Sequence, residues 1–168
     1  MAGMKLGAGG LVKELLPRFY GKGVDIGEHP DFGGVSGAHA PNSHHYYGEA
    51  FDFRDWRADF APEFEGGPEL SWLDRTRRFV ARAKELGVTE ALGPDDKGHD
   101  SHGHIAIRGE KEFTPEMLDY LATGRYKGPS GEWLTSWSGG TAKGGATTSE
   151  STTGASTTGA STTGAGTT

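Results

Sequence analysis

The last 25 residues of the chain contain nothing that could enter a hydrophobic core. From position 144 to 168 every residue is Gly, Ala, Ser or Thr apart from one Glu, and the unit Ser-Thr-Thr-Gly-Ala occurs three times in tandem from Ser151. Ordering such a segment alone would cost backbone entropy without burying apolar area. We therefore expect a folded domain over residues 1–140. Residues 141–168 are then a low-complexity tail, either a flexible linker or a segment that a partner orders.

The composition excludes several classes of partner. All 27 Val, Ile, Leu and Phe precede the tail, and with four Trp and five Tyr they favour a small packed core. The net charge is −6 and no basic run occurs, which argues against nucleic acid or anionic membrane as the main partner. No stretch approaches the roughly 18 apolar residues of a membrane span, and no signal peptide is visible. Because the chain lacks Cys, nitrogen and oxygen ligands must hold any metal.

Local patterns predict a small α+β domain with segregated helices and few strands. Residues 11–16 are predicted to form a short amphipathic turn or helix that ends at Pro17. A helix over about residues 70–86 has Ser71 and Asp74 as its start signal and Gly87 as its stop signal. A last helix starts with Thr114 as N-cap and Pro115 at the first helical position, and it ends before Gly124. Alternating residues predict strands at 51–56 and 104–108. The Gly- and Pro-rich stretch 21–41 is predicted to be loop, with a short strand near 34–37.

Six of the seven histidines fall into two clusters, and only His29 stands apart. The clusters are His39, His44 and His45, and His99, His102 and His104. Strand alternation places Asp52 on one face with Gly48 and Ala50, and Phe51 and Phe53 on the other. It likewise places His102 and His104 opposite Ile105 and Ile107. Two strands that are apolar on one side and bear His or Asp on the other predict a metal site on the sheet.

These residues resemble a known family. Ser43-x-His45-x-x-Gly48-x-Ala50-x-Asp52, followed about 50 residues later by His102-x-His104, is similar to the zinc D-Ala-D-Ala carboxypeptidase and endopeptidase family, whose fold is shared with the hedgehog signalling domain. The resemblance covers residues 34–108, and it implies an α+β fold in which a small antiparallel sheet with flanking helices lies behind the metal. It implies that His45, Asp52 and His104 bind Zn²⁺, and that the chain hydrolyses an amide bond in the peptide part of bacterial peptidoglycan.

At the position of the catalytic base, this sequence differs from part of the family. Many members have Glu three residues before the last metal ligand, and others have Asp directly before the His-x-His pair, but Ser101 takes both places here. Another branch has His-x-x-His-x-His, which His99, His102 and His104 match. We therefore expect His102 to move the proton or stabilise the oxyanion, with His99 assisting. Asp100 is the alternative base.

Two further residues are expected at the substrate. Ser36-Gly37-Ala38-His39 stands where the family has Ser-Gly-Tyr-Arg, which implies that His39 replaces an arginine that contacts substrate or orients the site. Ser43, which opens the longer motif, is assigned to substrate binding as well.

Many family members are phage lysins or virion-associated wall hydrolases. The resemblance therefore implies a phage-encoded endolysin, active after release from the host cytoplasm to the cell wall, or a virion component whose tail contacts other virion proteins. Two alternatives stay open. One is a structural protein of the phage tail or baseplate that keeps the peptidase fold. The other is a zinc-stabilised binding module without turnover.

Overall fold

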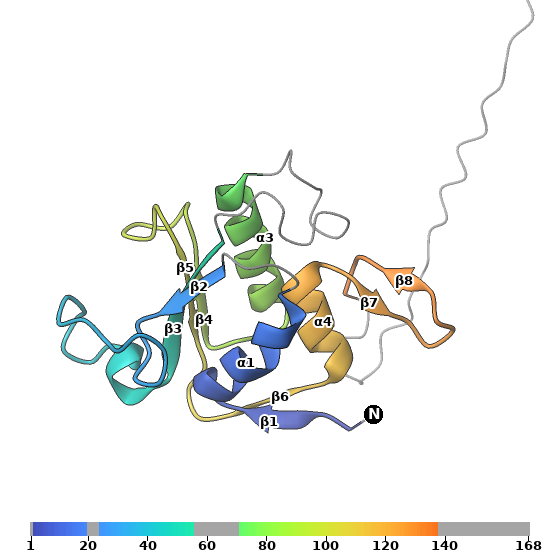
Figure 1. Ribbon diagram of the computed structural model, residues 1–168, viewed down its shortest axis with the longest axis horizontal. Helices are drawn as coiled ribbons and strands as arrows, with labels where there is room; N and C mark the ends of the chain where they lie inside the picture. Colours follow the sequence, from blue (N-terminus) through green and yellow to red (C-terminus); the bar gives the residue numbers. More distant parts are fainter. Residues whose placement is uncertain (1, 20–23, 56–70, 138–168) are drawn as a thin grey trace, which may run out of the picture.

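The computed structural model describes residues 2–19, 24–55 and 71–137, and this part of the chain has an α+β fold (Figure 1). Its centre is a four-stranded antiparallel sheet with the strand order β2-β3-β5-β4. The bounds of these strands are Val24–Gly27 for β2, Ala50–Asp55 for β3, Glu90–Leu92 for β4 and Gly103–Ala106 for β5. The predicted fold class, helices with small antiparallel sheets, is confirmed.

Helices and short strands surround this sheet. The described α-helices are α1 (Ala8–Leu15), α3 (Trp72–Glu85) and α4 (Pro115–Thr123), and the 3-10 helices are η1 (Leu16–Arg18) and η2 (His44–Tyr47). Two antiparallel strand pairs complete the described part: β1 (Met4–Leu6) with β6 (Lys111–Phe113), and β7 (Tyr126–Lys127) with β8 (Trp133–Leu134). No helix among the described residues is long and apolar enough to cross a membrane.

The helix ends follow the predicted capping signals. The Ser71 hydroxyl accepts a hydrogen bond from the Asp74 backbone N–H at 3.2 Å and starts α3. Thr114 caps α4 in the same way, with Pro115 at the first helical position. Gly124 ends α4 in the left-handed region at φ 73°. These signals are short-range, so the sequence alone was enough to place them.

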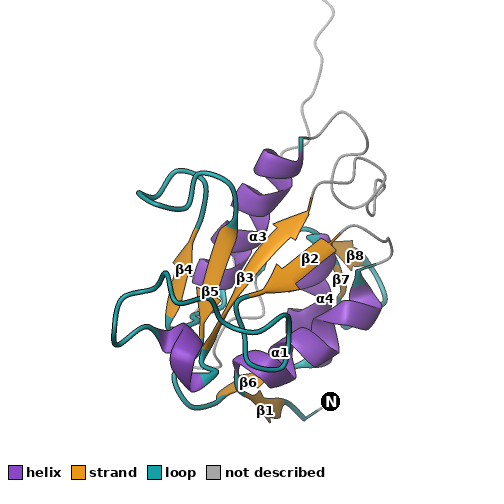
Figure 2. Ribbon diagram, turned by 60° about the vertical axis from the view of Figure 1, so that its left-hand side comes forward, coloured by secondary structure: helices purple, strands orange, loops and turns teal. Residues whose placement is uncertain are grey.

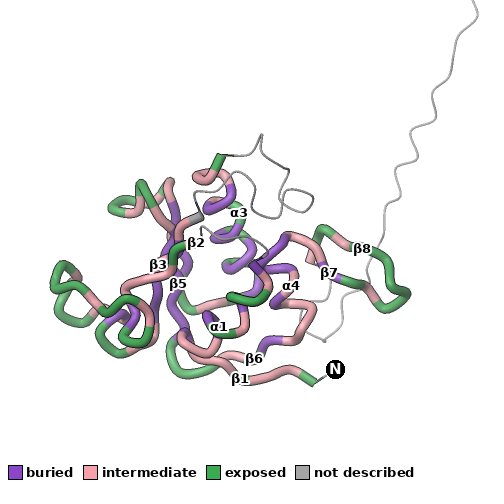
Figure 3. The backbone as a smooth tube through the Cα atoms, in the orientation of Figure 1, coloured by how far each residue is buried: buried purple, intermediate pink, exposed green. Residues whose placement is uncertain are grey.

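The hydrophobic core lies between the helices and one face of the sheet (Figures 2 and 3). Phe51 and Phe53 are both buried there, as their alternation predicted. The ring of Phe53 stacks on Phe79 of α3, with centroids 4.2 Å apart. Gly103 lets the same helix approach β5 closely, because a Cβ there would lie only 3.1 Å from a methyl carbon of Val80. With the helices on this face, the residues that alternate with the phenylalanines are left on the other.

The structure corrects the sequence prediction at several places; for example, α1 begins at Ala8 and not at residue 11, and β5 ends at Ala106 and not at residue 108. The strand expected near 34–37 is absent: Gly34 makes only an isolated bridge to His29 and has a left-handed φ of 74°. Strand β2 was missed, because the alternation of Val24 and Ile26 with Asp25 and Gly27 is only four residues long and lies within a Gly-rich stretch. Gly48 is not a strand residue; it ends η2 at φ 68°, and β3 begins at Ala50. The predicted tail and the domain boundary at 140 lie outside the described residues, as do Trp56 and Leu70.

Candidate metal centre

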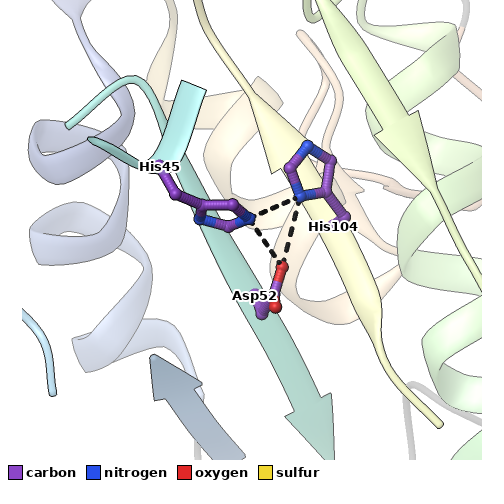
Figure 4. Close-up of side chains that lie close together, drawn as sticks. All are labelled: His45, Asp52 and His104. Carbon is purple, nitrogen blue, oxygen red and sulfur yellow. Dashed lines mark hydrogen bonds and ion pairs between the residues drawn. The ribbon is translucent and has the colours of Figure 1, made fainter. Parts of the chain in front are cut away.

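Three side chains from separate elements, His45, Asp52 and His104, converge beside strands β3 and β5 (Figure 4). Asp52 of β3 and His104 of β5 are direct cross-strand partners in the antiparallel register, so their side chains lie on the same face. His45 comes from η2, and the left-handed Gly48 turns the chain from this helix into β3. The predicted group of His45, Asp52 and His104 is thus assembled by one strand pair and one tight turn.

The geometry of this group suits a metal ion. His104 Nδ1 lies 3.0 Å from His45 Nε2 and 3.2 Å from Asp52 Oδ1, and His45 Nε2 lies 3.3 Å from the same oxygen. Tetrahedral coordination with bonds of about 2.0–2.1 Å places ligand atoms roughly 3.3 Å apart. His45 and His104 are buried, and the side chain of Asp52 is 18% exposed. Two imidazole nitrogens and one carboxylate oxygen could therefore hold a metal ion at this point.

The pKa of Asp52 is lowered and the pKa of His45 is raised, because contacts within the group outweigh the effect of burial on each side chain. Burial by itself would raise the pKa of Asp52, but hydrogen bonds from His104 and His45 outweigh it and hold this pKa far below its usual range. Burial would likewise lower the pKa of His45, yet the hydrogen bond and charge of Asp52 raise it above the ordinary value. The site therefore keeps a carboxylate ionised at neutral pH, as a metal ligand must be.

The outer nitrogens of both histidines face protein oxygens. His45 Nδ1 donates to the backbone carbonyl of Glu28, which leaves the Nε2 lone pair for the centre. His104 turns Nδ1 to the centre, and its Nε2 lies 2.9 Å from Oε1 of Glu90. The N–H does not point along that contact, so Nε2 is buried without an aligned hydrogen bond. A carboxylate is nevertheless in place beside the outer nitrogen.

Of the residues expected to act as catalytic groups, His102 and His99 lie at the centre and Asp100 does not. His102 Nε2 is 3.5 Å from Asp52 Oδ2, and Ser101 Oγ is 3.5 Å from His102 Nδ1. The rings of His99 and His102 lie 5.1 Å apart, and both side chains line the cavity over the centre. Asp100 is exposed and is not among the residues that line this cavity.

Burial lowers the pKa of His102, and the neighbouring His99, His104 and His45 lower it further, whereas the charge of Asp52 opposes the shift. The net direction is downward, so this imidazole is mostly neutral near pH 7. A neutral imidazole beside the centre can accept a proton.

The two residues assigned to substrate binding border the same cavity, whose volume is about 530 Å³. His39 stacks on the ring of His45 with centroids 4.1 Å apart, and its Nε2 lies 2.9 Å from Glu28 Oε2. Ser43 caps η2, where its hydroxyl accepts from the His45 backbone N–H at 3.4 Å. The geometry gives both residues a contact with His45 that the sequence did not reveal.

Glu28 and Glu90 were not found from the sequence. Glu28 lies in the Gly-rich stretch before the histidine cluster, and its pKa is lowered mainly by a hydrogen bond from the Ser36 backbone N–H and then by one from His39. Glu90 is on β4, which reaches His104 only because β4 pairs with β5. Neither position is marked by local spacing, since each depends on contacts between distant segments.

The pKa shifts predict how the metal-free protein responds to pH. Asp52 stabilises the fold above its unfolded pKa of about 4, and this contribution is lost as the pH falls through the lower folded value. His45 stabilises below its unfolded pKa of about 6.5, and this contribution is lost as the pH rises through the raised folded value. The loss of stability caused by Asp52→Asn should therefore be largest between about pH 4 and 6.5. Urea unfolding in the presence of a chelator measures it, and a loss independent of pH would contradict the assigned ion pair.

The centre thus consists of three converging donors, a neutral histidine beside them and a cavity that opens over them. Histidine and aspartate supply all three donors, which is a ligand set common to several divalent metals. Comparison of the chain with protein-family models, with curated proteins and with solved structures found no match.

Proposed function

We propose that the protein is a zinc-dependent peptidase that hydrolyses amide bonds in the peptide part of bacterial peptidoglycan. The observation that supports it most is the convergence of His45, Asp52 and His104 beneath an open cavity. Three protein ligands of mixed histidine and carboxylate type, with a position left for water or substrate, are the usual arrangement of catalytic zinc. The motif resemblance to the zinc D-Ala-D-Ala carboxypeptidase and endopeptidase family supplies the substrate class.

The chain's own residues divide the chemistry between them. Zinc, when bound, would lower the pKa of a bound water to about 7 and polarise the scissile carbonyl. His102 faces Asp52 through Nε2, so this nitrogen is placed to accept a proton at the centre and return it to the leaving amine. Ser101 lies at the opposite ring nitrogen of His102. His99 lies beside His102, where it can assist.

The cavity provides the surroundings for a peptide. His39 and Ser43 form part of its wall on the η2 side, and Glu90 and Leu92 of β4 form part of the wall on the other. We include His39 and Ser43 in the proposal as substrate contacts. The family resemblance further favours a phage-encoded wall hydrolase, either an endolysin or a virion component.

Zymography on bacterial cell walls tests the proposal. The zinc-loaded wild type should clear the gel, and neither His104→Ala nor the wild type in EDTA should do so. Mass spectrometry of the released fragments then identifies the bond that is cut. An absence of clearing by zinc-loaded wild type on walls of several chemotypes would contradict the peptidase.

A second function class is favoured by one residue. Ser101 stands directly before His102, where part of the family has a carboxylate, and its hydroxyl is a poor base. A zinc-stabilised binding module, or a virion structural protein that keeps the fold, would bind zinc at the same centre without turnover. Tight zinc binding together with intact cell walls in the zymogram would support this class.

Glu90 provides a prediction of metal affinity. Metal binding through Nδ1 fixes the proton of His104 on Nε2, and a nearby carboxylate then makes the imidazole a better ligand. Glu90→Ala should weaken zinc binding by about 10-fold, at the lower end of the 10–100-fold range for such partners because the contact is poorly aligned. Competition with a chromophoric chelator measures it. Glu110→Ala, an exposed site outside the cavity, serves as control, and equal affinities of the two variants would exclude the role of Glu90.

A further inference from the structure

Glu28 has an unusual backbone conformation. It is the non-glycine residue with positive φ in the described part of the chain, at 56°. The left-handed region is sterically unfavourable for an L-residue, because its Cβ approaches the following carbonyl oxygen. Such a conformation persists only where the surrounding contacts enforce it, and it is often found at functional sites. The contacts of Glu28 therefore need an explanation.

Both the main chain and the side chain of Glu28 lead to the metal centre. Its carbonyl accepts from His45 Nδ1. Its carboxylate oxygen Oε2 accepts from the Ser36 backbone N–H at 2.8 Å and lies 2.9 Å from His39 Nε2. The carbonyl thus sets which nitrogen of His45 faces the centre, and the carboxylate holds His39.

His39 completes a second restraint on the same ligand. Its ring stacks on the ring of His45 at an interplanar angle of 30° and with centroids 4.1 Å apart. The Nδ1 hydrogen bond fixes one edge of the His45 ring, and the stacked His39 covers one face. Together they restrict rotation of the imidazole about both of its side-chain torsions.

We infer that Glu28 and His39 form a clamp that orients His45 for metal binding, with Glu28 acting as a positioning residue through its carbonyl and through His39. This inference rests on the proposed metal centre, but it does not require that the protein turns over a substrate. Held ligands bind metal more tightly because less rotational freedom is lost on binding.

The chain contains a matched pair that serves as a control. His44 Nδ1 lies 2.9 Å from Glu49 Oε2, and the side-chain exposures of this pair are close to those of His39 and Glu28. His44 is adjacent to His45 in sequence, but neither His44 nor Glu49 lines the cavity. Any general effect of removing a histidine–glutamate pair near η2 should therefore appear equally in both pairs.

Contacts other than those of the Glu28 carboxylate also hold the loop that contains Glu28. The neighbouring His29 is buried, and its Nε2 lies 3.1 Å from the Gly48 carbonyl at the end of η2. Its Nδ1 accepts from the Asp31 backbone N–H at 3.0 Å. Because His29 already ties the loop to η2, Glu28→Gln, which keeps the backbone carbonyl, is expected to fold.

Zinc affinity measured by chelator competition tests the clamp. Glu28→Gln and His39→Ala should each weaken zinc binding about 10-fold. The loss of zinc affinity in the double variant should be clearly smaller than the product of the two single losses, because both changes break the same restraint. Glu49→Gln and His44→Ala should stay within about 2-fold of wild type, as ordinary surface substitutions do. The visible spectrum of Co²⁺ bound in place of zinc should change in the two clamp variants alone, since it reports ligand geometry.

Three outcomes would overturn the inference. The first is equal zinc affinity of Glu28→Gln, His39→Ala and the control pair. The second is full multiplication of the two effects in the double variant, which would show independent roles. The third is a clamp variant that loses zinc affinity and loses as much stability in its metal-free form, while its Co²⁺-bound form keeps the wild-type spectrum. A wild type that binds zinc but cuts no cell wall would contradict the peptidase alone, whereas a wild type that binds no zinc would overturn both.

Discussion

Zinc is expected to raise the melting temperature of the wild type strongly and that of His104→Ala far less. A ligand that binds only the folded state at a thousand times its dissociation constant stabilises by about 4 kcal/mol. For a domain of this size that corresponds to a rise of roughly 8–16 °C. Removing His104 leaves two ligands, so its effect on zinc affinity should exceed the roughly 100-fold upper limit seen for residues that only support a ligand.

A control is needed because His104 is buried and its removal also affects packing. Ile107→Val shortens a buried side chain near the end of β5, and it should lower the melting temperature of the metal-free protein modestly. It should nevertheless keep the full zinc-dependent rise. Differential scanning calorimetry with and without zinc separates the two effects. If His104→Ala kept the wild-type rise, this histidine would not be a ligand.

His102→Ala should lower kcat by about 10²–10⁴-fold while zinc binding stays near the wild-type value. The range is that of a general acid or base. Zinc binding should persist because His102 lies beside Asp52 and outside the triangle of converging donors. Turnover of purified muropeptides, followed by chromatography, gives kcat, and chelator competition gives the affinity. A parallel loss of zinc affinity would make His102 a ligand instead.

Asp100 provides the discriminating comparison for the base. The sequence left it as the alternative, but its side chain is exposed and the cavity lining does not include it. Asp100→Asn should therefore change kcat by no more than about 2-fold, as a surface substitution does. In the pH profile of kcat/KM, the acidic limb of the wild type should lie below about pH 6.5, because the pKa of His102 is lowered. This limb should vanish in His102→Ala, and a loss of activity in Asp100→Asn as large as that in His102→Ala would reassign the base.

The parts of the structure that the sequence predicted well depend on short-range rules. The starts of α3 and α4 follow from Ser71 and Thr114, whose side chains bond to backbone groups three residues away. The alternation in β3 separates Phe51 and Phe53 from Asp52, because successive side chains of a strand point to opposite faces. The prediction of a strand at 34–37 was wrong for the opposite reason. Glycines permit many conformations, so the local pattern does not determine the secondary structure there.

The sequence by itself determined which donors are available for a metal, because side-chain chemistry sets the ligand types and strand alternation separates Asp52 and His104 from the apolar faces of their strands. Only the tertiary structure decided what surrounds them. Glu90 reaches His104 because β4 pairs with β5, and Glu28 reaches His45 through a left-handed turn after a strand that the sequence concealed. The physical reason is that ligand type follows from side-chain chemistry, whereas ligand orientation depends on backbone paths that meet only when distant segments pack.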